Sequence, residues 1–268
     1  MTGRVSRDAA SHRARRAGAL RDAAWSALST VRDPELDRPV TDLGFVAGLS
    51  VEAGVARVRL RLPTFFCAPN FAYLMVADAR DALAAVPDLR GAEVRLEDHF
   101  AAEEINTGAA AVGGGFVDTF PGLADGELAE LRRTFASKAH LAAQERLARR
   151  LGREGWAAAD LSGLRLGDVP ASTDLDRVRR RRVDLGLSAG DDTPVFTDDT
   201  GRAVPADELP AHLRFARAVR VSVDGNADWC QGLLSTRYGT RPTTRQAATP
   251  ARGRPAGSDR EQEGVERR

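Results

Sequence analysis

Residues 55–62 alternate strictly between two kinds of side chain, and this pattern constrains the fold more than any other part of the chain. The alternation gives one face Ala56, Val58, Leu60 and Leu62, and the other Val55, Arg57, Arg59 and Arg61. A period of two is typical of a β-strand with one buried face. Residues 45–51 also read as a strand, and the intervening Glu52-Ala53-Gly54 indicates a tight turn. The sequence therefore predicts a β-hairpin.

Segments with helical spacing of apolar residues precede and follow this hairpin. Apolar residues recur three to four positions apart within residues 14–31, which predicts an amphipathic helix. Asp33-Pro34 ends it, because the residue before proline is displaced from helical geometry. Similar spacing predicts a second helix over 71–86, and alternation predicts a third strand over 92–96. The order α-β-β-α-β describes a small domain of the α/β (α+β) class.

The rest of the chain carries weaker signals. A helix is predicted over 125–152, followed by short strands at 194–197 and 219–223 and helices at 209–217 and 228–238. We expect a second, smaller mixed α/β region there. The predicted organisation is a disordered basic arm at 1–13, the first domain at 14–100, a glycine-rich linker at 101–124, the helix and accessory region at 125–238, and a disordered tail at 239–268.

Composition excludes several classes of protein. The chain has 268 residues, 43% of them hydrophobic, with 39 basic against 38 acidic side chains. No stretch is long and apolar enough for a membrane span, and the basic start lacks the apolar region of a secretory signal. Two cysteines cannot form a disulfide framework, so we expect a cytoplasmic protein with reduced thiols. Both ends are basic but the acidic body lacks a basic stripe, which argues against nucleic-acid binding.

Three short motifs in the first domain bear on chemistry. They are Asp33-Pro34-Glu35, Asp42-Leu43-Gly44 and Thr64-Phe65-Phe66-Cys67. The last motif places Cys67 at the start of the second helix, where unpaired backbone N–H groups favour negative charge. A thiolate there is both a nucleophile and a soft metal ligand. The simpler interpretation treats Cys67 as a small buried side chain, the aspartates as turn or cap residues, and Gly44 as a backbone requirement.

These motifs, in this order and spacing, resemble the iron–sulfur assembly domain typified by PaaD and SufT. The resemblance covers residues 27–96, about a quarter of the chain, and leaves the C-terminal extension unassigned. It implies a role in building or inserting iron–sulfur clusters, with Cys67 as the functional residue. Members similar to PaaD accompany multicomponent oxygenases, so an oxygenase is the implied client. Within this resemblance Asp33, Pro34, Glu35, Asp42, Gly44 and Thr64 are supporting motif residues.

The chain departs from the family pattern at three places. Ala68 separates Cys67 from the proline that usually follows directly, and Phe65-Phe66 replaces a Pro-Gly pair. The aromatic-proline ending after the last strand is replaced by Glu97-Asp98-His99-Phe100. The fold tolerates these changes, but the client and the precise chemistry do not carry over directly from the family.

The ligand count limits how metal is held. A cluster usually takes four thiolates, with histidine as a known substitute, but this chain offers only Cys67 and Cys230. A stable cluster would need a homodimer, ligands from a partner, or help from His99 and nearby carboxylates. Plain iron is an alternative cargo. Cys230 also opens a predicted helix, and simple burial is the alternative interpretation of its position.

Other enzyme signatures are absent from the sequence. It has no G-x-x-x-x-G-K-[ST] phosphate loop, so we expect no nucleotide, and the Asp-Thr-Gly at 199–201 is explained by a hairpin turn. We therefore predict a non-enzymatic maturation factor that coordinates iron or a cluster transiently through Cys67. Its partners would be a client metalloenzyme or other cluster-assembly proteins. A docking protein for an oxygenase complex and a redox-active thiol protein are the second and third hypotheses.

Overall fold

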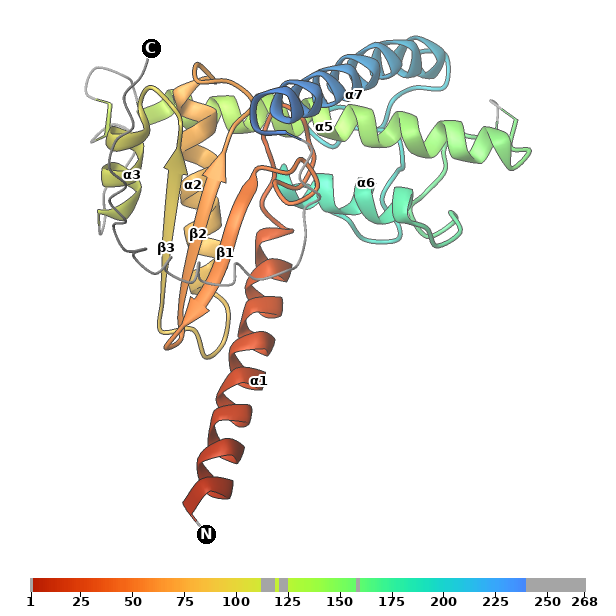
Figure 1. Ribbon diagram of the computed structural model, residues 1–268. Helices are drawn as coiled ribbons and strands as arrows, with labels where there is room; N and C mark the ends of the chain where they lie inside the picture. The colour runs from red at the N-terminus through yellow and green to blue at the C-terminus, as the bar shows by residue number, and fades with distance from the viewer. Residues whose placement is uncertain (1, 112–118, 121–124, 158–159, 240–268) are drawn as a thin grey trace, which may run out of the picture.

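The computed structural model describes residues 2–111, 119–120, 125–157 and 160–239, and its first half is built on a three-stranded sheet (Figure 1). Strands β1 (Val46–Glu52), β2 (Val55–Arg61) and β3 (Gly91–Glu97) lie in the order β1-β2-β3. The first pair is antiparallel and the second is parallel. Ala53 and Gly54 both have positive φ, 50° and 82°, as a two-residue type I′ turn requires. The predicted hairpin is confirmed.

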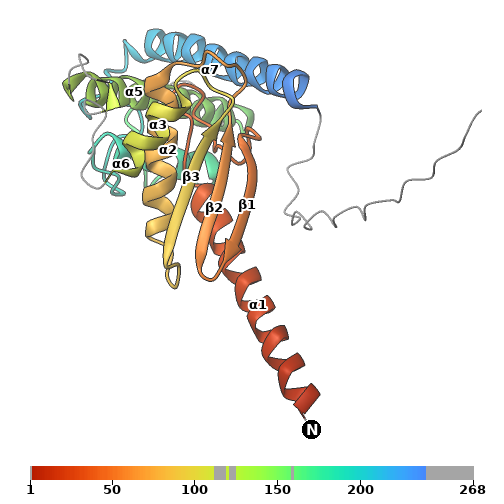
Figure 2. The ribbon, with the colours of Figure 1, turned by 60° about the vertical axis from the view of Figure 1, so that its left-hand side comes forward.

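Helices cover one face of the sheet. They are α1 (Thr2–Leu28) and α2 (Pro69–Ala84), which bury the apolar face of β2 (Figure 2). Ala56, Val58 and Leu60 are at most 1% exposed, as their alternation predicts. The opposite face carries charges, with Arg57 paired to Glu93 across the parallel strands. The predicted α+β class is therefore confirmed.

Two predicted irregular segments are helical instead. Helix α1 begins at Thr2, so the arm expected to be disordered over 1–13 continues the helix. That segment has no proline, and its three arginines and two alanines are strong helix formers. The predicted linker at 101–124 contains α3 (Ala102–Ala110), which buries Ile105 against the first core. The glycines at 113–115 and the tail from residue 240 lie outside the described residues.

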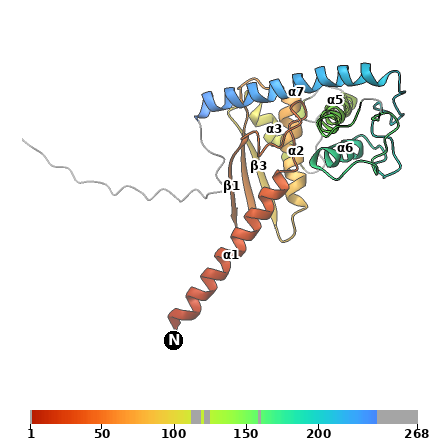
Figure 3. The ribbon, with the colours of Figure 1, turned by 90° about the vertical axis from the view of Figure 1, so that its right-hand side faces the viewer.

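The second half of the chain is built from α5 (Asp125–Arg153), α6 (Thr173–Asp184) and α7 (Leu209–Tyr238). These helices and their loops enclose a second hydrophobic cluster around Leu147 and Leu151. In Figure 3, α7 runs along the outside of the molecule, across α5 and the end of the sheet. The domain boundaries proposed from the sequence stay predictions.

The strands predicted in this half do not form among the described residues. Residues 219–223 lie inside α7, where Ala216, Val223 and Ala227 are buried at helical spacing. The helical period therefore outweighs the β-branched composition of that segment. Residues 194–197 make only isolated bridges, because the Gln144 side chain occupies both the N–H and the C=O of Thr197 at 3.0 Å.

The Asp-Thr-Gly segment is a turn, as predicted. Thr197 and Ala203 form a bridge across it, and Gly201 has a φ of 87°. The Asp198 carboxylate accepts hydrogen bonds from the backbone of Thr200 and Arg202. Among the described residues, no helix combines the length and apolar character needed to span a bilayer.

Candidate functional site

Three loops meet at one end of the sheet. Because β2 and β3 are parallel, the loops that follow them, at 62–68 and 98–101, begin at the same end of the sheet. Strand β1 is antiparallel to β2, so the loop before β1, at 41–45, lies at that end too. The topology therefore gathers the Asp42-Leu43-Gly44 and Thr64-to-Cys67 motifs at one place.

Cys67 lies one residue before the helix cap. Ala68 is the N-cap of α2 and Pro69 is its first residue, so the extra alanine moves the thiol out of the first turn. The side chain is partly buried against the first core. Its Sγ lies 3.3 Å from Thr64 Oγ1, and a thiolate there would accept a hydrogen bond from that hydroxyl. Thr64 therefore contacts Cys67 within the loop, and the roles predicted for the two residues stay predictions.

His99 holds this loop through the backbone. Its Nε2 lies 2.8 Å from the carbonyl oxygen of Cys67, and its Nδ1 accepts the Ala101 N–H at 3.2 Å. A nitrogen that accepts an N–H carries no proton, so the proton is on Nε2, which donates to the carbonyl. His99 is only 4% exposed. Both ring nitrogens are thus engaged, and His99 is arranged to position Cys67 rather than to offer a free nitrogen to metal.

Three aromatic rings surround the thiol loop on the solvent side. Phe65, Phe66 and Phe100 are 44%, 77% and 49% exposed, and their ring centroids lie 5.1 to 6.4 Å apart. The Phe100 N–H donates to the Phe65 carbonyl at 3.1 Å, which joins the two loops. We call these three residues the aromatic cluster. The sequence showed these residues only as departures from a family pattern, and the available signal was the pair of phenylalanines directly before Cys67.

The other motif residues shape the neighbouring loops. Asp33 is 7% exposed, and its Oδ1 accepts the N–H groups of Glu35 and Leu36 at 2.9 and 2.8 Å. Burial raises the pKa of Asp33 to about 6, against the opposing effect of those hydrogen bonds. Pro34 lies within the turn that Asp33 closes. Gly44 has a φ of 78°, a conformation that favours glycine.

Helix α7 brings the second cysteine to these loops. Gln231 donates to the Asp42 carbonyl at 3.0 Å, and Arg237 donates to the carbonyls of Leu62 and Asp98. Next to Gln231, Cys230 packs on the first core. Burial raises the pKa of Cys230 to about 11, and the nearby charges of Asp33, Cys67 and Glu35 contribute to the increase. The sequence placed Cys230 at the opening of a helix, whereas it lies within one, near Cys67.

Comparison with known proteins agrees with this arrangement. The model of a family described as iron-sulfur cluster assembly protein matches residues 21–96. Residues 21–96 form an iron–sulfur cluster assembly domain. The chain is also 36% identical over 77 residues to the iron-sulfur cluster carrier protein of Deinococcus radiodurans, which covers 29% of this chain. The match spans only 21%, about a fifth, of that relative. No solved structure matches the chain.

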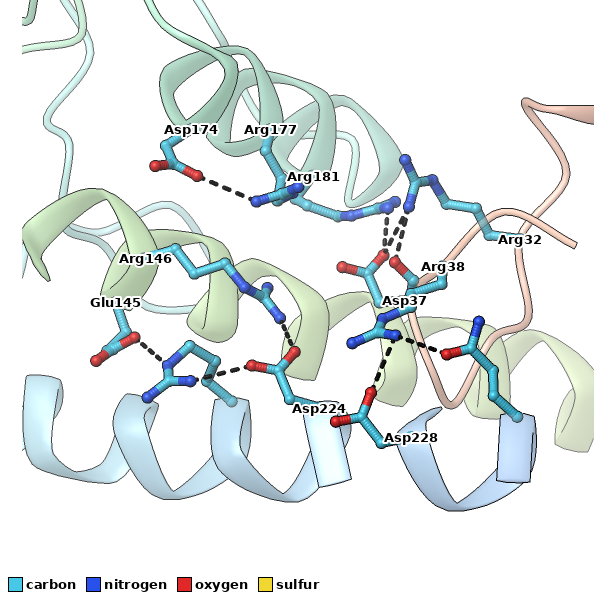
Figure 4. A network of polar contacts seen from close by, with 12 residues as sticks. Arg32, Asp37, Arg38, Glu145, Arg146, Asp174, Arg177, Arg181, Asp224 and Asp228 are labelled. Atoms are coloured by element: carbon cyan, nitrogen blue, oxygen red, sulfur yellow. Dashed lines mark hydrogen bonds and ion pairs between the residues drawn. The ribbon is translucent and has the colours of Figure 1, made fainter. Parts of the chain in front are cut away.

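Ion pairs connect the assembly domain to the helices that follow it (Figure 4). Asp37, which has a φ of 51°, lies between Arg32 and Arg181 of α6. The Asp37 and Arg181 side chains are 5% and 8% exposed, so this pair is buried. Arg38 reaches Asp228 of α7 at 3.2 Å. Helices α6 and α7 therefore contact Asp37 and Arg38, which lie just after the Asp33-Pro34-Glu35 motif.

The donor set does not fit a resident cluster held by one chain. Within the described parts of the chain, no three histidine, cysteine or acidic side chains are grouped so that they could hold a metal ion. Two thiols are available, and the nitrogens of His99 are occupied. Glu103 and Glu104 are exposed on the first turn of α3. Any iron or cluster handled by the assembly domain is therefore cargo that needs further ligands.

The two thiols should differ in reactivity. With a pKa of about 11, roughly one Cys230 thiol in a thousand is ionised at pH 8. We expect iodoacetamide to alkylate the Cys230→Ser variant, which keeps Cys67, at least tenfold faster than the Cys67→Ser variant. Mass spectrometry over pH 6 to 10 measures both rates. Equal rates at pH 8 would contradict the assignment of Cys67 as the reactive thiol.

Proposed function

We propose that this protein delivers iron or an iron–sulfur cluster to a client metalloenzyme, with Cys67 as the transient ligand. The observation that carries the proposal is the surface on which the thiol lies. Thr64 and His99 fix the loop from within, and the aromatic cluster stands exposed beside it. An exposed aromatic surface is the kind of feature that binds another protein. A held thiol next to such a surface suits transfer between proteins.

The shortage of ligands supports transfer over storage. An iron–sulfur cluster is usually held by four ligands, and the chain contributes one reactive thiol and one thiol that burial keeps protonated. The remaining ligands would come from the donor or the client. Cys67 would then bind the cargo only while a partner is docked, and the cargo would leave with the partner.

The resemblance to PaaD and SufT extends the proposal to the client. The proposed client is a metalloenzyme such as a multicomponent oxygenase, and other cluster-assembly proteins are the proposed donors. Two unpaired cysteines suit a reducing compartment, so we place this activity in the cytoplasm.

A second candidate function follows from the aromatic cluster alone. Phe66, at 77% exposure, could anchor an oxygenase subunit without any metal chemistry at Cys67. In that case the protein would be a non-catalytic accessory subunit, and the thiol would be incidental.

Anaerobic loading separates the two functions. The complex of the chain with its co-purifying apo-client is incubated with ferrous iron and sulfide, and the two proteins are then separated. The carrier predicts visible absorbance and iron in the separated client, and their loss with the Cys67→Ser variant but not with Cys230→Ser. A client that loads as well with Cys67→Ser as with the wild type would support the accessory subunit and contradict the carrier. Peroxide-dependent sulfenylation of Cys67, with no bound iron, would instead indicate a redox thiol protein.

A further inference from the structure

The outer face of α7 is unusual for a helix in contact with solvent. Eight residues follow one another there at alternating steps of three and four: Ala211, Phe215, Ala218, Ser222, Gly225, Trp229, Gly232 and Thr236. All eight are exposed and none is charged. Steps of three and four are the spacing of a coiled-coil seam. We call this row the α7 seam.

No described element covers the seam. In Figures 1 to 3, α7 lies at the outside of the molecule, with α5 and the sheet on its inner side only. Ala216, Val223 and Ala227, which are buried, point to that inner side. Phe215 and Trp229 are 61% and 70% exposed on the outer side. Water is a poor solvent for two such rings, so the face is suited to a partner.

We propose that the α7 seam pairs with the seam of a second copy of this chain, with the two helices antiparallel. In an antiparallel pair, large residues of the seam in one copy lie opposite small residues of the seam in the other. A two-fold axis between Ser222 and Gly225 places Phe215 opposite the partner's Gly232, and Trp229 opposite the partner's Ala218. Each large ring therefore faces a small residue, as interdigitating helices require. At the axis, serine meets glycine, which lets the helices approach closely.

Charges beside the seam favour the same direction. Arg214 and Arg217 lie on one flank of the seam toward its start, and Asp228 lies on that flank toward its end. Antiparallel pairing sets this flank against the same flank of the partner, which moves the arginines of one copy toward the partner's Asp228. Parallel pairing would set it against the partner's other flank, where no acidic residue of α7 lies. Asp228 already contacts Arg38 but keeps 72% of its side chain exposed.

This dimer would not assemble a cluster from four thiols. Cys230 lies on the inner half of α7, and it would stand about 13 residues, or roughly 20 Å, along the helix axis from the partner's Cys230. The pairing therefore provides assembly without blocking the Cys67 loops, and it stands or falls separately from the proposed function.

The oligomeric state of the full chain tests the proposal. Sedimentation equilibrium should show a dimer for the wild type, and Trp229→Glu should weaken dimerisation at least tenfold because it places a charge in the seam. Val183→Glu is the matched control, since Val183 is 64% exposed on α6 and lies off the seam. A wild type that is monomeric at about 100 μM, or a Trp229→Glu variant as dimeric as Val183→Glu, would overturn it.

Cross-linking tests the direction and register. In a chain with Cys67→Ser and Cys230→Ser, a short bismaleimide should link copies carrying Ser222→Cys, because that residue lies next to the two-fold axis. Thr236→Cys is equally exposed on the same row but would lie about 25 residues, or roughly 37 Å, from its counterpart. It should not link. Linking of Thr236→Cys as efficiently as Ser222→Cys would exclude the antiparallel register.

Discussion

A client metalloenzyme produced together with the Cys67→Ala variant is expected to contain at most about a tenth of its normal iron. The variant removes the one thiol that is held beside the aromatic cluster, so cargo would lose its ligand at the point of transfer. Binding of the client should persist, because the aromatic rings remain. Iron content and activity of the purified client measure the loss.

Two further variants make this result specific. Cys230→Ala should leave client iron near its normal level, because that thiol is protonated at neutral pH. Phe66→Asp should abolish client binding itself, since it places a charge in the centre of the aromatic cluster. Cys67→Ala should cost about 1 kcal/mol of stability or less, so misfolding would not explain its effect. Normal iron loading of the client with Cys67→Ala would contradict the carrier function and favour the docking function.

Asp37→Asn is expected to lower the free energy of unfolding by about 3 kcal/mol. The carboxylate lies between Arg32 and Arg181, and burial followed by the nearby Arg181 charge already lowers the pKa of Arg32 to about 10. Without the carboxylate, the Arg32 and Arg181 guanidinium groups would face each other with no negative charge between them, although Arg181 would keep its ion pair with Asp184 and Arg32 its bond to the Asp37 carbonyl. Urea unfolding followed by tryptophan fluorescence measures the change.

Asp88→Asn is the matched control for that substitution. Asp88 also has a positive φ, 67°, so both variants place asparagine in a left-handed conformation that it tolerates. Asp88 is exposed, and its replacement should change the unfolding free energy by less than about 0.5 kcal/mol. Similar urea midpoints for the two variants would mean that the buried pair contributes nothing to stability.

Local patterns predicted the assembly domain well because its elements follow short-range rules. Alternation from Val55 to Leu62 fixes which face of β2 is buried, and the positive φ angles of Ala53 and Gly54 follow from a two-residue turn. The motif spacing then placed Cys67 and Thr64 in one loop. Each of these features depends on neighbours within a few residues.

Long-range contacts explain what the sequence did not predict. Residues 219–223 favour a strand by composition, but they lie in α7, where Val223 is buried on the inner side of the helix. Cys230 and Cys67 are more than 160 residues apart in the sequence. They lie near each other only because of where α7 crosses the end of the sheet. His99 became a loop-positioning residue only because its ring meets the carbonyl of Cys67.

The buried pair of Asp37 and Arg181 also sets a limit on how this protein can be divided or recombined. A segment excised as the assembly domain alone would carry Asp37 and Arg32 to the surface without their third partner, and would expose the loops on which α7 rests. Conversely, grafting these accessory helices onto another assembly domain would require an acidic residue at the position of Asp37. The two halves therefore depend on each other through this carboxylate as well as through the contacts that α7 makes with the same loops.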